Sequence, residues 1–228
     1  MAAPPGLAEW VAFVSEHLVE RYGRRRFRLG DPLNELIGTI LSQNTSDLNS
    51  SRAFAALKNR YPQPGDLLAA PPEELAATIR SGGLANIKAE RIQQALHAIV
   101  ERTGALDLGV LADLPMPKAR AWLAGLPGVG GKTASCVLLF ALGMPAMPVD
   151  THVQRLSVRL GFAPVRSSPD TIAAILETAT NPAAIYDLHV NLIQHGRTIC
   201  IAGRPRCRDC LLEARCPKVG VARQGEER

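Results

Sequence analysis

The sequence is poor in several features that would assign it to common protein classes. Aromatic residues make up only 4% of its 228 residues, so a core has to be built mainly from Ala, Leu, Ile and Val. No segment offers the roughly 20 consecutive apolar residues of a membrane helix. The start "MAAPPGLAEWVAFVSEHL" lacks the basic residues and the unbroken apolar run of a signal peptide. These absences predict a cytoplasmic protein that has no membrane segment.

The sequence also lacks the alternation of apolar and polar residues that marks a half-buried β-strand, and it has no internal repeat. Apolar residues instead recur at helical spacing from residues 7–22 through to residues 184–200. Several of these segments open with Asp-Pro or Pro and close with Gly, which are signals of helix ends. We therefore predict an all-α fold. The proline-rich stretch 144–148 is a candidate junction between two lobes.

Basic residues exceed acidic ones by 26 to 21, a formal net charge of +5. The excess is concentrated in two places. Residues 21–30 contain five arginines, and a second group that includes Arg204 and Arg206 lies among the C-terminal cysteines. A single arginine run is commonly a solvated surface. Two runs in a chain that also has the glycine-rich loop described below favour a polyanionic partner.

Five cysteines in a cytoplasmic protein indicate a metal site and one spare thiol rather than disulfides. Four of them follow the spacing C-x6-C-x2-C-x5-C, at Cys200, Cys207, Cys210 and Cys216. Zinc and an iron–sulfur cluster both accept four thiolates. Only one pair has the short spacing of a zinc knuckle, so the spacing favours [4Fe–4S] and leaves zinc open. Cys136 is predicted to be a buried core thiol, and His195 to pack against the cysteine region.

The stretch "GLPGVGGKTAS" (125–135) has the wrong spacing for an ATP-binding P-loop. A P-loop requires Gly six positions before Lys132, where this chain has Leu126. A P-loop also follows a strand, whereas a helical pattern precedes this stretch. Phosphate binding of the ATPase type is therefore excluded.

The same stretch predicts two helices joined by a tight turn. Gly128 and Gly130 can adopt backbone angles that are closed to other residues, so the chain can turn sharply there. Leu126 and Val129 would anchor the turn in the core. The exposed amides, together with the N-terminus of the second helix, would suit a DNA phosphate.

Lys132 is predicted in the first turn of that helix, where a cation opposes the helix dipole by about 0.3–1 kcal/mol. One reason for this placement is contact with phosphate. Another is chemistry, since the dipole and apolar neighbours both favour a neutral, nucleophilic amine. Asp150, in "PVDTHVQR", stands where Asp commonly caps a helix. A carboxylate there can also stabilise a developing sugar cation or move protons, and the residues alone leave these alternatives open.

Taken together, the motifs resemble the endonuclease III family, helix-hairpin-helix DNA glycosylases with a C-terminal iron–sulfur loop. The resemblance rests on "LSQNTSD", "GLANIKAERI", "LPGVGGKTAS", "VDTHVQR" and the cysteine spacing, in that order, and spans residues 31–216. It implies a six-helix barrel over residues 25–144. A second helical domain would combine residues 1–24 and 145–228, with the loop 200–216 holding a [4Fe–4S] cluster through its four cysteines.

The resemblance implies a monomeric, bifunctional DNA glycosylase and AP lyase of base excision repair, located with the nucleoid in the cytoplasm. Its substrates would be oxidised or ring-saturated pyrimidines and abasic sites in double-stranded DNA. Lys132 corresponds to the family's nucleophile, which forms a Schiff base before β-elimination, and Asp150 to its essential acid. Two alternatives are a damage-surveying DNA-binding protein with little catalysis and a monofunctional mismatch glycosylase.

The resemblance also implies DNA contacts beyond the chemistry. Either Gln43 or Asn44 would fill the space left by a flipped base, and Leu84 would act as a wedge. The family often has Gln where Asn44 aligns, Tyr at Ala85 and a larger, often basic, residue at Gly131, and these departures bear on the range of lesions. The residues assigned to DNA binding are Gln43, Asn44, Leu84, Leu126, Gly128, Val129, Gly130, His152, Arg204 and Arg206.

Overall fold

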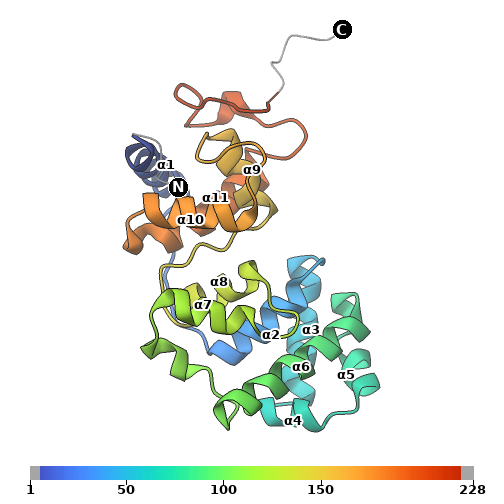
Figure 1. The fold of residues 1–228 in the computed structure, drawn as a ribbon. Helices are drawn as coiled ribbons and strands as arrows, with labels where there is room; N and C mark the ends of the chain where they lie inside the picture. Colours follow the sequence, from blue (N-terminus) through green and yellow to red (C-terminus); the bar gives the residue numbers. More distant parts are fainter. Residues whose placement is uncertain (1–5, 222–228) are drawn as a thin grey trace. The chain divides into compact units, whose positions relative to one another are not determined.

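The computed structural model describes residues 6–221, and every regular element in this part of the chain is a helix, which confirms the predicted all-α class. None of the described helices is both long and apolar enough to cross a membrane. The chain divides into two compact units (Figure 1). One unit is Arg28–Met144. The other combines the chain up to Phe27 with the chain from Pro145 onward.

The unit Arg28–Met144 is built around α2 and α8. α2 packs against α3, α6 and α8, and its side chains Leu36, Ile37 and Ile40 are at most 2% exposed. Most of α8 is buried as well. The helices of this unit are α2 (Pro32–Ser42), α3 (Asp47–Arg60), α4 (Pro64–Ala69), α5 (Pro72–Thr78), η1 (Arg80–Gly82), α6 (Ala85–Thr103), η2 (Gly109–Asp113), α7 (Met116–Ala124) and α8 (Gly131–Phe140).

Polar caps fix the starts of α2 and α3. The side chain of Asp31 accepts a hydrogen bond from the backbone N–H of Asn34 at 2.8 Å, and Pro32 occupies the first helical position. Ser46 accepts one from the N–H of Asn49 at 3.3 Å. Because α2 ends at Ser42, only a four-residue loop, 43–46, separates the two helices.

In the other unit, α11 packs against α1 and α9, and its Leu188 and Leu192 are buried. The indole N–H of Trp10 on α1 donates to the carbonyl of Leu160 at 2.7 Å. After α11, the described chain up to residue 221 forms a long loop whose only regular element is the short helix η4. The helices are α1 (Leu7–Tyr22), α9 (Thr151–Arg159), α10 (Pro169–Ala179), η3 (Pro182–Ala184), α11 (Ile185–Thr198) and η4 (Cys207–Asp209).

Candidate functional site

The turn between α7 and α8 is a tight hairpin that joins two helices, as the sequence predicts. Gly128 has φ 73°, in the left-handed region that favours glycine. Gly130, which the sequence also allowed to adopt such angles, has φ −94° and caps α8, so Gly128 alone of the two uses the freedom of glycine. Leu126 and Val129 are 3% and 6% exposed, and they anchor the turn in the core.

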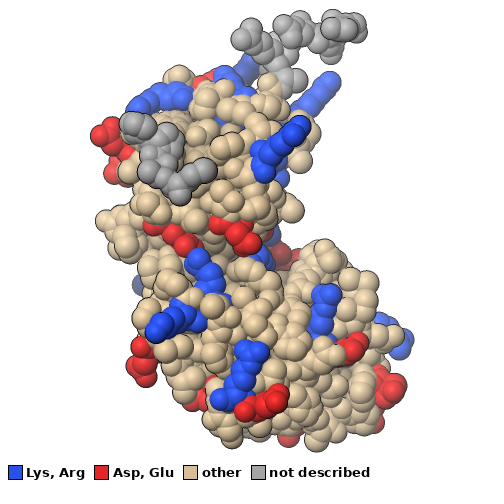
Figure 2. All heavy atoms as spheres, in the orientation of Figure 1, with Lys and Arg blue, Asp and Glu red and all other residues tan. Residues whose placement is uncertain are grey.

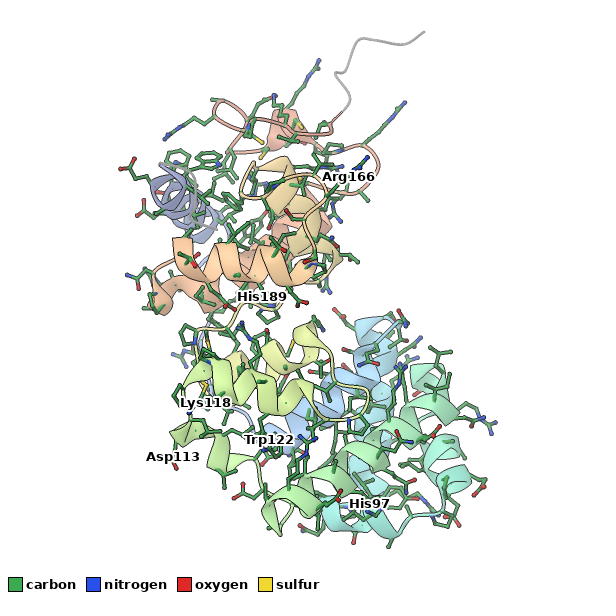
Figure 3. The ribbon with its side chains drawn as sticks, in the orientation of Figure 1. His97, Asp113, Lys118, Trp122, Arg166 and His189 are labelled. Carbon is green, nitrogen blue, oxygen red and sulfur yellow. The ribbon has the colours of Figure 1, made fainter. Side chains whose placement is uncertain are left out.

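Two arginines of α6 brace this hairpin. A Cβ added to Gly128 would lie 2.9 Å from Cγ and Cδ of Arg91, so the Arg91 side chain lies directly against the turn. Arg102 donates to the carbonyls of Trp122 and Gly125 at 3.1 and 2.7 Å. Its guanidinium also lies 5.3 Å from the ring centre of Trp122, which Figure 3 labels on α7. Sequence reasoning missed both arginines, because nothing local marks them as partners of a turn.

Lys132 is the second residue of α8, and its side chain is exposed. Its charge interacts with Glu35 of α2. Burial raises the pKa of Glu35, while the hydrogen bond from Thr39 Oγ1 at 3.1 Å and the charge of Lys132 lower it. Cys136 lies one turn further along α8. Burial raises the pKa of its thiol to about 11, so Cys136 is the neutral core group that the sequence predicts. Glu35 was also missed, since it resembles any first-turn helix acid.

Gln43 and Asn44, which the sequence left as alternatives, have different environments. The Oε1 of Gln43 accepts a hydrogen bond from Arg91 at 2.9 Å, and its Nε2 donates to the carbonyl of Gly128 at 3.3 Å. Asn44 is exposed and has φ 52°, which is uncommon for a residue other than glycine. Gln43 therefore connects the α2–α3 loop to the hairpin, whereas Asn44 is available to a partner.

Leu84 precedes α6 and is 52% exposed. It has φ 49°, again in the left-handed region. Ile87, one turn further along α6, is 46% exposed. An aliphatic pair on the surface at a helix start is open to an apolar partner such as a base.

In the other unit, Asp150 caps α9, as predicted. Its Oδ1 accepts a hydrogen bond from the N–H of Val153 at 2.8 Å. The Nδ1 of His152 lies 3.1 Å from the guanidinium of Arg155. Arg155 also donates to the carbonyl of Cys200 at 3.1 Å. The first turns of α9 are therefore linked to the start of the cysteine loop.

The four C-terminal cysteines line one cavity, at Cys200, Cys207, Cys210 and Cys216. Burial raises the pKa of Cys210 to about 11 and also raises that of Cys216, and the neighbouring sulfurs add to both effects. Four thiolates around one cavity therefore need positive charge from a metal group. Between residues 6 and 221, no three His, Cys, Asp or Glu side chains converge closely enough to hold a single ion. Zinc and an iron–sulfur cluster both accept four thiolates, so the donor set fits either group.

Side chains of α1, α9 and α11 hold this loop as well. The Nε2 of His195 lies 3.4 Å from Cys210 Sγ, and its Nδ1 lies 2.9 Å from the hydroxyl of Tyr22. Burial lowers the pKa of His195 to about 4, so the ring is neutral. His195 therefore packs against the cysteine region, as expected. Arg159 donates to the carbonyls of Ile201 and Ala202, each at 2.7 Å.

The cysteine loop also carries basic side chains on its surface. Arg204 and Arg206 are both exposed. In Figure 2, Lys and Arg side chains project from the end of this unit that carries the loop. A surface with exposed basic side chains is suited to contact with a polyanion.

Comparison with known proteins places these features in a family. The family described as HhH-GPD superfamily base excision DNA repair protein matches residues 37–182. Endonuclease III of Thermotoga maritima is 34% identical over 216 residues, which cover 94% of this chain and 96% of that protein.

Solved structures agree with this match. A trapped endonuclease III–DNA covalent intermediate, in an estranged-adenine complex, is 31% identical with a TM-score of 0.78, covering 92% of this chain and 96% of that one. A thermostable thymine-DNA glycosylase also has a TM-score of 0.78, at 23% identity, covering 93% of this chain and 98% of that one. The second likeness shows a shared fold alone.

Proposed function

Because this chain belongs to the HhH-GPD superfamily of base excision DNA repair proteins, we propose that it is a bifunctional DNA glycosylase and AP lyase of the endonuclease III type. Its substrates are oxidised or ring-saturated pyrimidines and abasic sites in duplex DNA. One observation carries the proposal. Lys132 is an exposed amine in the first turn of α8, directly after the hairpin that Gly128 forms.

Lys132 supplies the nucleophile. Its neutral amine attacks C1′ of the damaged nucleotide, and the bond from C1′ to the base breaks. The base leaves with the electrons of that bond and takes up a proton. Opening of the sugar gives an imine, which makes the C2′ proton acidic, and loss of that proton expels the 3′ phosphate. The nucleotide has to leave the base stack first, because C1′ is shielded in a duplex.

Two carboxylates are assigned to charge and proton handling. Asp150 is oriented by its hydrogen bond from the Val153 N–H, and it stabilises positive charge on the sugar as the base leaves. Glu35 interacts with the charge of Lys132 and holds the ammonium in place until the amine loses its proton. Each role predicts that neutralising the carboxylate slows adduct formation without preventing DNA binding.

DNA binding is assigned to the hairpin and to two exposed residues of the same unit. The hairpin 126–130 contacts a backbone phosphate, with the side chains of Arg91 and Arg102 behind it. Asn44 fills the space left by the flipped base, because Gln43 is engaged by Arg91 and by the hairpin. The protein acts as a monomer on DNA of the cytoplasmic nucleoid.

The four cysteines are assigned to a [4Fe–4S] cluster, which supplies a rigid connection between distant points of the loop when it is bound. All four ligand positions come from the protein, so the role is structural. The exposed Arg204 and Arg206 contribute phosphate contacts from the loop, and His152 contributes through Arg155.

Borohydride trapping on an abasic duplex tests this function. Reduction converts the imine into a stable amine, so the wild-type protein is expected to form a covalent adduct that Lys132→Ala abolishes. Lys118→Ala, which changes an exposed lysine on α7, should form the adduct normally (Figure 3). A lesion panel scored for base release and for strand cleavage then defines the substrates.

Two outcomes would replace the proposal. Binding to abasic duplex without any adduct would indicate a damage-surveying protein. Base release that leaves the strand intact until alkali is added would indicate a monofunctional glycosylase.

A further inference from the structure

Lys88 of α6 is a buried lysine that sequence reasoning left unassigned. Its side chain is 1% exposed, although lysine is almost never fully buried. The ammonium donates to the carbonyl of Leu41 at 2.7 Å and to the carbonyl of Gly82 at 2.8 Å. Burial lowers the pKa of Lys88. Burying a charged group away from water is unfavourable, so the two hydrogen bonds of Lys88 are expected to have a structural or functional role.

Both acceptors lie at helix ends. Leu41 belongs to the last turn of α2, and Gly82 is the final residue of η1. The last carbonyls of a helix, at its C-terminal end, have no partner within the helix. A cation at that end also interacts favourably with the helix dipole. A Cβ added to Gly82 would lie 3.9 Å from the Leu41 carbonyl oxygen, so the two chain segments approach each other closely. Lys88 therefore joins two helix ends that are distant in sequence.

Each of these carbonyls lies just before an exposed residue with left-handed backbone. Asn44 follows Leu41 by three residues and has φ 52°, and Leu84 follows Gly82 by two and has φ 49°. In the described chain, only Lys218 otherwise combines a positive φ with a side chain. Such a conformation is unfavourable for a residue other than glycine and persists only where its surroundings hold it.

We propose that Lys88 is a positioning residue, which fixes the α2–α3 loop relative to the η1–α6 turn so that Asn44 and Leu84 enter the duplex together. The inference rests on the proposed function and deepens it. An ammonium suits the task because it offers three donors and can satisfy two carbonyls at once. A side chain of similar length without donors fills the same space but leaves both loops free to shift.

The test compares Lys88→Met with the wild type on two abasic substrates. Duplex DNA requires insertion into the stack, whereas single-stranded DNA does not. We expect the rate of borohydride trapping on duplex to fall between about tenfold and a hundredfold, as small misplacements do. The rate on single-stranded DNA should stay unchanged. An equal loss on both substrates, or no loss on duplex, overturns the inference.

Four variants complete the comparison. Asn44→Ala and Leu84→Ala should each reproduce the selective loss on duplex, and Lys118→Met on α7 should leave both rates as in the wild type. Lys88→Gln keeps a donor on a shorter chain, so it should show a smaller loss confined to duplex. If Lys88→Met does not fold, Lys88→Gln decides the matter, and an equal loss on both substrates again overturns the inference.

Binding is measured in parallel on intact duplex and on duplex that contains a tetrahydrofuran abasic analogue. The preference for the analogue is the Kd for intact duplex divided by the Kd for the analogue duplex. Lys88→Met should lower this ratio toward one. A wild type that forms no adduct on either substrate refutes the proposed lyase. The Kd ratio still tests the positioning role of Lys88. An unchanged ratio in Lys88→Met overturns the inference even if the protein has no lyase activity.

Discussion

Two loop regions of this protein are held by the same kind of contact but depend on it differently. In the unit Arg28–Met144, Lys88 and Arg102 project from α6 and donate to backbone carbonyls near the ends of α2, η1 and α7 and in the turn after α7. In the other unit, Arg155 and Arg159 project from α9 and donate to carbonyls of the loop after α11. A single cationic helix face therefore organises the loops in each unit.

The surroundings of these contacts differ. Buried apolar side chains anchor the segments beside α6. Leu41 near the end of α2 is 0% exposed, and Leu126 in the turn between α7 and α8 is 3% exposed. Among the described residues after Cys200, Leu212 is the only Leu, Ile or Val that is buried. The cations of α6 thus reinforce a core that packing already defines, whereas those of α9 assist a loop that needs its cysteine ligands.

Removing one cysteine ligand should have the largest effect. Cys210→Ser is expected to lose iron and more than about 4 kcal/mol of stability, because the loop has little apolar area to replace the lost ligand. Iron and sulfide content, brown colour and proteolysis of the loop measure the change. Cys136→Ala is the control, which should keep its iron and cost about 1–2 kcal/mol as a small core truncation. A colourless wild type that contains zinc would overturn the assignment of the cluster.

The hairpin should tolerate less change at Gly128 than at Gly130. Gly128→Ala combines φ 73° with a Cβ placed 2.9 Å from two carbons of Arg91. We expect it to cost about 2–3 kcal/mol in the free energy of unfolding. Gly130 has ordinary φ and no atom within 4 Å of an added Cβ, so Gly130→Ala should cost less than about 1 kcal/mol. Urea unfolding compares the two, and equal costs would contradict this account of the turn.

The cationic contacts of the two regions can be compared directly through Arg159→Met and Arg102→Met. Arg159 donates to three carbonyls, those of Cys200, Ile201 and Ala202, and Arg102 donates to two. Each substitution should cost about 1–2 kcal/mol, because the contacts are exposed or only partly buried. Only Arg159→Met should speed the loss of iron to a chelator, since its contacts belong to the cysteine loop. Faster iron loss in Arg102→Met would show that the two regions are not independent.

The sequence predicted the features that depend on neighbouring residues. Helical periodicity, the cap at Asp150 and the burial of Leu126 and Val129 all follow from local pattern, and the structure agrees. It did not distinguish Gln43 from Asn44, because the difference depends on Arg91, 48 residues further along the chain.

The lysines show the same limit. Lys132 was identified from its place after a glycine turn. Lys88 was not, because a buried lysine looks like a surface one in sequence. Its contact with Leu41 spans 47 residues, and only the packing of α6 against α2 brings the two together.

The smallest expected effect concerns the surface of the cysteine loop. Arg206→Gln leaves the cysteine ligands in place, so the iron content and stability should match those of the wild type. If Arg206 contacts a phosphate, the slope of log Kd against log salt should fall by about 1, equally for damaged and intact duplex. Lys118→Gln removes the same charge from α7 of the other unit and controls for net charge, so it should leave the slope nearly unchanged. An unaltered slope in Arg206→Gln would mean that the cysteine loop stabilises its own unit without contacting DNA. DNA binding would then depend on the loops beside α6.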